Sequence, residues 1–341
     1  MRLRFETVTA AAVFSFASVV TFGAPSATHA TGARYATDAY PGFDLEESIK
    51  PSKKEPRWFS FINGPKMADP VSQFAWCETC ERNEDWSAAR KGYDALVREW
   101  PTSPLAPRAQ LRLAELEVQD RSFEDAFAEY RYLLDFFSSS CDYNEVAKRM
   151  YALAEQLRAD GKYFVFFHFA NTVDVRRAYE ALVLRAPGAD FVPKAMLTIA
   201  SLRIDEGKFQ EAVTVFENLR NLHPDTPEAA ESVVREARIR MKMLDEMGYN
   251  RSRVQDTIDF LRLSLRGDLE QSVREELDAA LAKARDMYEA EAWKAAAFYD
   301  SRTRTKRSAI NAYEVYLKDY PDGPHSDEAR ARRDALLEGS K

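Results

Sequence analysis

The chain has 341 residues, of which 45% are hydrophobic, 12% aromatic and 30% charged. This balance is that of an ordinary soluble protein with enough apolar residues for an extended core, and it excludes disorder of the whole chain. The formal net charge of −7 argues against nucleic-acid binding, because phosphates would repel an acidic surface. Three cysteines are too few for a disulfide-stapled scaffold, so stability must come from packed helices.

Residues 1–30 have the pattern of a secretory signal. Two arginines precede an apolar stretch from about Val8 to Gly23, and small residues lead up to Ala30. We expect cleavage after Ala30 and export to the periplasm; the alternative, a retained anchor, is disfavoured because a spanning helix needs about 20 apolar residues. The first cysteine is Cys77, which does not support acylation at the cleavage point.

Residues 31–68 contain glycine and proline with little periodicity, which predicts a flexible segment. A basic and aromatic run within it is a candidate surface for a membrane or a partner protein, and its candidate binding residues are Arg57, Trp58, Phe59 and Phe61. The alternative is a segment that only covers the first repeat, because terminal repeats need capping.

A spacing pattern recurs six times after this segment: a small residue, an aromatic or branched residue four positions on, an apolar residue seven on, and often a proline twelve on. The copies begin at Ala89, Ala126, Val175, Ala212, Val254 and Ala309, the fifth being degraded. Offsets of zero, four and seven lie on one face of an α-helix, and the proline ends that helix. Each copy therefore predicts a helix that needs a neighbouring helix to bury its stripe.

A second helical pattern precedes several copies. It is visible at 109–116, 147–157 and 193–203, and Gly161 and Gly207 are expected to end the last two of these helices. The repeating unit is therefore predicted to be helix, turn, helix.

These features resemble the tetratricopeptide repeat over roughly residues 70–335. The successive spacings of 37, 49, 37, 42 and 55 residues exceed the ideal of about 34, so longer helices or inserts must absorb the excess. The resemblance implies an all-α solenoid of about five to six helix pairs with a concave binding face. We divide it into N-terminal repeats one to four at 69–248 and C-terminal repeats five and six at 249–341.

Three stretches, from Asp85 to Pro104, from Ala109 to Leu116 and from Leu281 to Asp322, are similar to the BamD family, the repeat subunit of the outer-membrane β-barrel assembly machinery. The resemblance implies a periplasmic platform with a peripheral association with the outer membrane. Its C-terminal repeats would dock on the barrel-assembly protein, and its N-terminal repeats would receive unfolded outer-membrane proteins. An alternative is a soluble periplasmic adaptor for envelope division or cell-wall synthesis, as in the Tol-Pal coordinator family. The missing acylation site favours this alternative.

Two inserts between helices hold candidate partner-binding residues. About nine extra residues in the third repeat carry an aromatic run, which either folds onto the solenoid core or grips a partner; its members are Phe164, Phe166, Phe167 and Phe169. The turn of the last repeat is basic, and its candidate docking residues are Arg302, Arg304, Lys306 and Arg307. The simpler interpretation of such a charge run is a solvated turn.

Cys77 and Cys80 have redox or half-zinc-site spacing, but structural zinc needs four ligands and no matching pair follows. Cys77 is expected in the core, where other copies have Ala114, Ala200 and Ala297. Cys80 is expected nearer water, and a disulfide with Cys77 or Cys141 stays open.

An enzyme is not expected. His168, His223 and His325 are scattered without a nucleophile, metal ligand or acid at a recognisable spacing. No phosphate-binding glycine loop or metalloprotease motif is present. We therefore expect no catalytic residue, no cofactor and no metal, and a function carried by protein partners.

Overall fold

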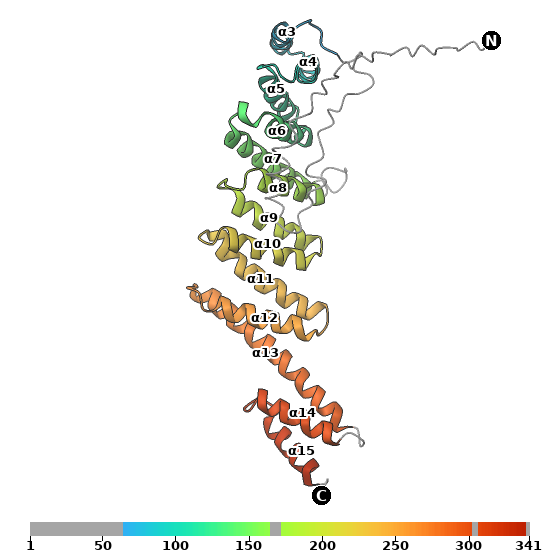
Figure 1. The fold of residues 1–341 in the computed structure, drawn as a ribbon, viewed down its shortest axis with the longest axis vertical. Helices are drawn as coiled ribbons and strands as arrows, with labels where there is room; N and C mark the ends of the chain where they lie inside the picture. The colour runs from blue at the N-terminus through green and yellow to red at the C-terminus, as the bar shows by residue number, and fades with distance from the viewer. Residues whose placement is uncertain (1–63, 164–171, 302–305, 339–341) are drawn as a thin grey trace, which may run out of the picture.

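The computed structural model of the chain describes residues 64–163, 172–301 and 306–338. In these residues it forms only helices, arranged as six antiparallel pairs stacked into an elongated solenoid, followed by α15 (Ser326–Glu338) (Figure 1). The pairs are α3 (Pro70–Arg82) with α4 (Trp86–Glu99), α5 (Ala106–Gln119) with α6 (Phe123–Phe137), α7 (Tyr143–Tyr163) with α8 (Thr172–Arg185), α9 (Val192–Asp205) with α10 (Phe209–Leu222), α11 (Pro227–Glu246) with α12 (Arg251–Ser264), and α13 (Gln271–Asp300) with α14 (Lys306–Asp319). The predicted all-α solenoid is confirmed.

The second helix of every pair buries the repeated stripe. The exposed fractions of the eighteen stripe residues lie between 0 and 3%. The degraded fifth copy is buried as completely as the others, with Val254 and Leu261 at 0% and Ile258 at 3%. Branched side chains fill the space that aromatic rings fill elsewhere, so the change of residue type does not interrupt the stack.

The turn inside a pair has the same geometry in repeats one, two and four. After α9, Gly207 has φ +75°, its N–H donates to the Ile204 carbonyl, and the N–H of Lys208 donates to the Arg203 carbonyl. Those two bonds satisfy carbonyls that the helix end leaves free, as in the Schellman motif. Glu84 after α3 and Arg121 after α5 occupy the same position with φ of 60° and 59°.

Helix ends follow the predicted breakers with one exception. Pro101, Pro187, Pro224 and Pro321 each lie two residues after the last residue of their helix. The second copy has no proline, and α6 instead runs into a 3-10 helix at Ser138–Ser140. Gly161 does not end its helix, because α7 extends to Tyr163; glycine costs a helix only about 1 kcal/mol, which flanking turns can offset.

Long first helices absorb the excess repeat spacing. They are α7 with 21 residues, α11 with 20 and α13 with 30. The N-terminal half of α13 packs Leu277 and Leu281 against α11 and α12, whereas its C-terminal half packs Ala296 against α14 and α15. One helix thus belongs to two cores, which displaces the last pair along the solenoid (Figure 1).

Small residues occupy the closest approach of α3 and α4. A Cβ at Gly92 would lie 2.6 Å from the Cys77 sulfur and 2.6 Å from the Trp76 ring, so only glycine fits. Cys77 is fully buried, as expected. Cys80 is buried too, although its exposed fraction of 9% leaves it nearer water than Cys77.

In the last repeat the predicted core position, Ala297, is wrong by one residue. Ala296 is 1% exposed and lies in the core, whereas Ala297 is partly exposed. Ala296 lies thirteen residues before Ala309, whereas the equivalent buried residues of repeats one, two and four lie twelve residues before theirs. Counting back from Ala309 by the usual twelve residues therefore misses the buried position.

Within the described ranges, no helix combines the length and the apolar character that crossing a membrane requires. The expected signal at 1–30 and the basic-aromatic residues Arg57, Trp58, Phe59 and Phe61 lie outside the described residues.

Candidate functional site

The first helices of consecutive pairs lie side by side and run in the same direction, because each pair reverses the chain twice (Figure 1). Glu115 of α5 accepts a hydrogen bond from Arg149 of α7 at 2.7 Å, and Ser201 of α9 accepts one from Arg235 of α11 at 2.8 Å. Both contacts span 34 residues, so equivalent positions of neighbouring first helices face each other. The first helices therefore present a common face.

A groove of about 570 Å³ lies on this face between α3 and α5. Its lining residues are Phe74, Glu78, Glu81, Arg82, Tyr93, Arg108, Leu111 and Arg112. The hydroxyl of Tyr93 donates to Glu81 at 2.6 Å, and Arg112 pairs with the same carboxylate. Burial raises the pKa of the Glu81 carboxyl, but the hydrogen bonds from Arg112 and Tyr93 outweigh burial and hold it below its ordinary value.

A second groove of about 230 Å³ follows between α5 and α7. It shares Arg108 and Leu111 with the first groove, so both residues form the wall between them. The Arg108 guanidinium lies 5.0 Å from the centre of the Phe74 ring, within cation–π range. The wall between the two grooves therefore consists of the apolar Leu111 side chain and the Arg108 guanidinium, which packs over the Phe74 ring.

Opposite charges alternate across these two grooves. Arg112 pairs with Glu81 and with Glu115, and Arg149 pairs with Glu115 and with Glu145. The resulting ladder of three carboxylates and two guanidinium groups crosses α3, α5 and α7, so both signs are present across it. Such a surface suits a ligand that carries both charges, such as a peptide, and does not suit a polyanion.

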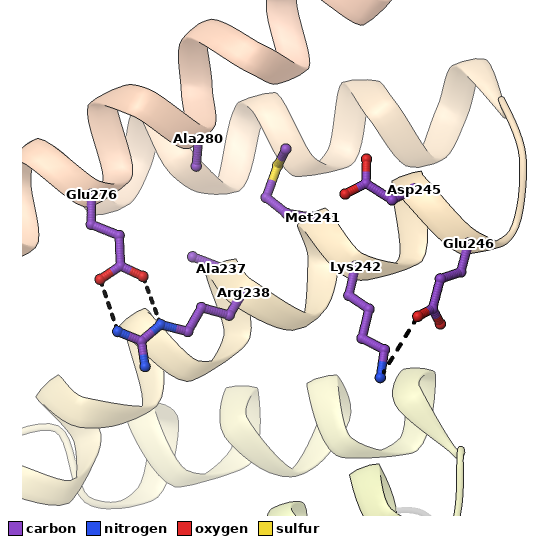
Figure 2. A pocket seen from close by; sticks show the side chains of 8 residues that line it. All are labelled: Ala237, Arg238, Met241, Lys242, Asp245, Glu246, Glu276 and Ala280. Atoms are coloured by element: carbon purple, nitrogen blue, oxygen red, sulfur yellow. Dashed lines mark hydrogen bonds and ion pairs between the residues drawn. The ribbon is translucent and has the colours of Figure 1, made fainter.

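The third groove, of about 380 Å³, lies between α11 and α13 (Figure 2). Ala237, Met241 and Ala280 supply its apolar lining, and charged residues from both helices surround them. Small side chains leave the space open, and methionine is flexible enough to adapt to different apolar partners.

Two ion pairs bridge α11 and α13 at this groove. Arg238 donates to both oxygens of Glu276, at 2.6 and 2.9 Å, and Lys283 donates to Asp245 at 2.8 Å. Both pairs span 38 residues, and along each helix they are two turns apart, about 10.5 Å. Exposed pairs contribute only about 0.2–1 kcal/mol, so charges of a partner can replace them at low cost.

The structure places only part of the predicted site. Phe164, Phe166, Phe167, Phe169, Arg302 and Arg304 lie outside the described residues. Lys306 and Arg307 are the first two residues of α14, and both are exposed. Their docking role stays a prediction.

The three thiols are free in the structure. Burial raises the pKa of the Cys77 thiol to about 12, which makes it a packing residue rather than a nucleophile. Among the described residues, no group of three His, Cys, Asp or Glu side chains is arranged to hold a metal ion.

Sequence reasoning missed the groove residues because they lie on the first helices, whose pattern is weaker than the stripe of the second helices. One available signal is the recurrence of charged residues on first helices one repeat apart, as in Glu81, Glu115 and Arg149. Separations of 31 to 38 residues blur that signal, since long helices shift the register between repeats.

Comparisons with known protein families support the helix-turn-helix repeat. Residues 81–140 and residues 194–226 each match a model of the tetratricopeptide repeat. The comparison with curated proteins gave no match.

Two solved structures are similar at low identity. A tetratricopeptide repeat protein from Parabacteroides merdae ATCC 43184 is 12% identical, with 79% of this chain and 98% of that chain covered and a TM-score of 0.28. An assembly chaperone of RpL4 (Acl4, residues 1–338) is 20% identical, with 78% and 92% covered and a TM-score of 0.28. At such scores, neither bears on the overall shape or the partners of this chain.

Proposed function

We propose that this tetratricopeptide-repeat chain is a non-catalytic scaffold that binds segments of partner proteins in the grooves between its first helices. The observation that carries the proposal is the recurrence of one arrangement: the α3/α5, α5/α7 and α11/α13 grooves all lie between successive first helices. Each combines apolar side chains with charges of both signs, which are the groups that a polypeptide segment can satisfy.

The chemistry of the grooves favours polypeptide over other ligands. Apolar side chains such as Leu111 and Met241 offer contacts to one or two side chains of a bound segment. The exposed pairs at the rim exchange partners at small cost, so a bound segment can contribute its own charges. Affinity then depends on engaging several grooves at once, because linked weak sites raise the effective concentration of each other.

A photo-cross-linking residue at Leu111 or Met241 tests groove binding. Matched controls carry the same residue at Leu263 of α12 or Val315 of α14, which are 67% and 59% exposed on second helices. We expect protein adducts from the two groove positions and few from the controls. Equal capture at all four positions would show that the first-helix face has no special role.

The finer proposal places this scaffold in outer-membrane protein assembly, as an exported periplasmic protein. The support is the sequence similarity of this chain to the BamD family. The stretches of this chain that carry the similarity fall on α4, α5, α13 and α14. The grooves would then receive unfolded outer-membrane proteins, and the C-terminal repeats would dock on the barrel-assembly protein. Export itself is tested by N-terminal sequencing of the mature protein, which should begin at Thr31.

Cross-linking in intact cells, with identification of the captured chains, tests this role. Recovery of the barrel-assembly protein together with nascent outer-membrane proteins is the expected result. Recovery of cell-wall synthesis or division proteins alone would instead favour the second candidate, a soluble periplasmic adaptor. The missing acylation site is the sequence feature that supports that candidate.

A further inference from the structure

One cation of the N-terminal grooves has no carboxylate partner. Among the described residues, the exposed Arg108 of α5 forms no ion pair, and its guanidinium packs over the Phe74 ring at 5.0 Å. Arg112 and Arg149, in contrast, are each engaged by two glutamates. Arg108 lies in the wall that the α3/α5 and α5/α7 grooves share. A ligand can therefore reach this cation from either groove.

The charge of Arg108 does not serve the helix that carries it. Arg108 is the third residue of α5, and the first turn of that helix has no acidic residue. The positive end of the helix dipole lies there, so a cation is unfavourable for the helix. The contact with Phe74 occupies one face of the planar guanidinium and leaves its N–H edge free for an acceptor.

Apolar side chains lie on the same face as this cation. Leu111 follows Arg108 by three residues on α5, which places both side chains on one side of the helix. Both line the α3/α5 groove together with Phe74. The volume of about 570 Å³ falls within the range of roughly 300–1,000 Å³ that is typical of ligand sites. The groove thus offers an apolar contact and a cation side by side.

The charges of the α3/α5 groove leave an excess of cations. Arg82 donates to the Glu78 carbonyl at 3.3 Å and to the Thr79 hydroxyl at 2.8 Å, but to no carboxylate in the described part of the chain. The Glu78 carboxylate has no cationic partner there either. Glu81 and Arg112 pair with each other. Two guanidinium groups and one carboxylate of the lining therefore remain without an opposite charge, which favours one added carboxylate rather than a run of them.

The α11/α13 groove differs in this respect. Its five charged lining residues all take part in ion pairs: Arg238 with Glu276, Lys242 with Glu246, and Asp245 with Lys283 (Figure 2). A ligand of that groove finds each charge already matched. The two regions therefore differ in what they can select, and only the N-terminal grooves favour an added negative charge.

We propose that the wall formed by Arg108 and Leu111 recognises an internal segment of a partner protein in which an aspartate or glutamate lies next to an aromatic or aliphatic residue. This inference rests on the proposed scaffold function and names the chemistry of its ligand. The partner's carboxylate accepts hydrogen bonds from the free N–H edge of Arg108. The neighbouring apolar side chain packs against Leu111 and Phe74, which a free anion would leave uncovered.

The first test is a selection of short peptides of random sequence on the full chain, in the form that the cell produces. The peptides are displayed on phage with their C-termini fused to the coat protein, so side chains supply the only carboxylates. We expect enrichment of Asp or Glu next to an apolar residue. A selection on the Arg108→Gln variant should lose that enrichment. The Arg266→Gln variant, which removes an exposed cation after α12, should keep it.

A synthetic copy of the best selected peptide, amidated at its C-terminus, then gives dissociation constants by fluorescence anisotropy. Arg108→Gln should weaken binding about fivefold, because an exposed ion pair contributes up to about 1 kcal/mol. Replacing the peptide's acid by its amide should weaken binding equally to the unmodified chain, with no further effect on the variant. Glu78→Gln should strengthen binding, because it removes a like charge from the groove.

Several results would overturn the inference: selected peptides without acidic enrichment, or unchanged affinity in the Arg108→Gln variant. It also fails if inorganic phosphate displaces the peptide as effectively as the unlabelled peptide does, since the apolar neighbours would then be irrelevant. A dimer of the unmodified chain that Arg108→Gln separates would identify a second copy as the occupant instead. Photo-adducts at Leu111 without acidic preference would overturn this inference alone, whereas absence of adducts at both Leu111 and Met241 would also overturn the scaffold function.

Discussion

The hydroxyl of Tyr179 on α8 donates a hydrogen bond to Glu155 of α7 at 2.8 Å, although the two residues are 24 positions apart. The same arrangement joins Tyr93 to Glu81 in the first repeat and Tyr313 to Asp300 in the last. In each pair, the central residue of the buried stripe reaches a carboxylate of the first helix, which lies at the helix end in the first and last repeats and about two turns before the end of α7 in the third. The tyrosine therefore fills the core and also fixes the packing of one helix against the other.

These tyrosines should make the protein sensitive to alkali. Burial, followed by the hydrogen bond to Asp300, raises the pKa of Tyr313 to about 12. Because the unfolded value is about 10, the folded state holds this proton more tightly. The associated stability is complete below pH about 10 and is lost as the pH rises toward 12.

Urea unfolding followed by circular dichroism at pH 8, 10 and 11 measures this loss. The Tyr313→Phe variant should lose less stability than the unmodified chain between pH 10 and 11. An equal loss in both would place the alkaline sensitivity in other groups.

Replacing Arg121 by glycine should stabilise the protein. Arg121 has φ 59° at the turn after α5, where Gly207 stands in the fourth repeat. A non-glycine residue pays about 1–2 kcal/mol for this conformation, and the larger unfolded-state entropy of glycine removes part of the gain. We expect a net increase of about 0.5–1 kcal/mol in the free energy of unfolding, measured by urea denaturation. A decrease would mean that the turn tolerates arginine without strain.

A methyl group at Gly92 should destabilise the first pair. The new Cβ would overlap the Cys77 sulfur and the Trp76 ring, both at 2.6 Å. Overpacking of this kind costs about 1–3 kcal/mol. Gly188→Ala is the control, because nothing lies within 4 Å of a Cβ there. Equal melting temperatures for the two variants would mean that α3 and α4 can move apart to accommodate the methyl group.

Buried and exposed ion pairs should differ sharply in their effect on stability. Arg176 is 1% exposed and donates to Glu180 at 2.7 Å and to Glu206 at 2.8 Å. Arg176→Gln leaves carboxylates short of a partner inside the protein and should cost about 3–5 kcal/mol. Arg238→Gln, at the exposed pair with Glu276, should cost at most about 1 kcal/mol. Denaturation midpoints of the two variants give the comparison, and similar midpoints would contradict it.

The cysteines should react with iodoacetamide in a defined order. Cys141 is partly exposed, whereas Cys77 is fully buried and burial raises the pKa of its thiol to about 12. Only the thiolate reacts, so Cys141 should be alkylated first and Cys77 only after unfolding. Mass spectrometry of peptides from the native and the urea-treated chain reads the order directly. Rapid labelling of native Cys77 would contradict the packing of α3.

The repeat could be predicted from the sequence because its signal is local. Offsets of zero, four and seven fall within two turns of one helix, so burial of the stripe leaves a readable pattern even in the degraded copy at Val254. The turns were harder to predict. Gly207 is visible as a helix end, but Glu84 and Arg121 adopt the same backbone conformation without the residue type that would reveal it.

The sequence by itself determined the helical class, a number of about five to six pairs and the core position of Cys77, since each depends on contacts within one pair of helices. Only the tertiary structure decided which first-helix residues face one another. Glu115 meets Arg149 across 34 residues, but Arg238 meets Glu276 across 38, because α11 has 20 residues against 14 in α5 and this length sets the register to the next first helix. The grooves arise from that register, so no local pattern could reveal them.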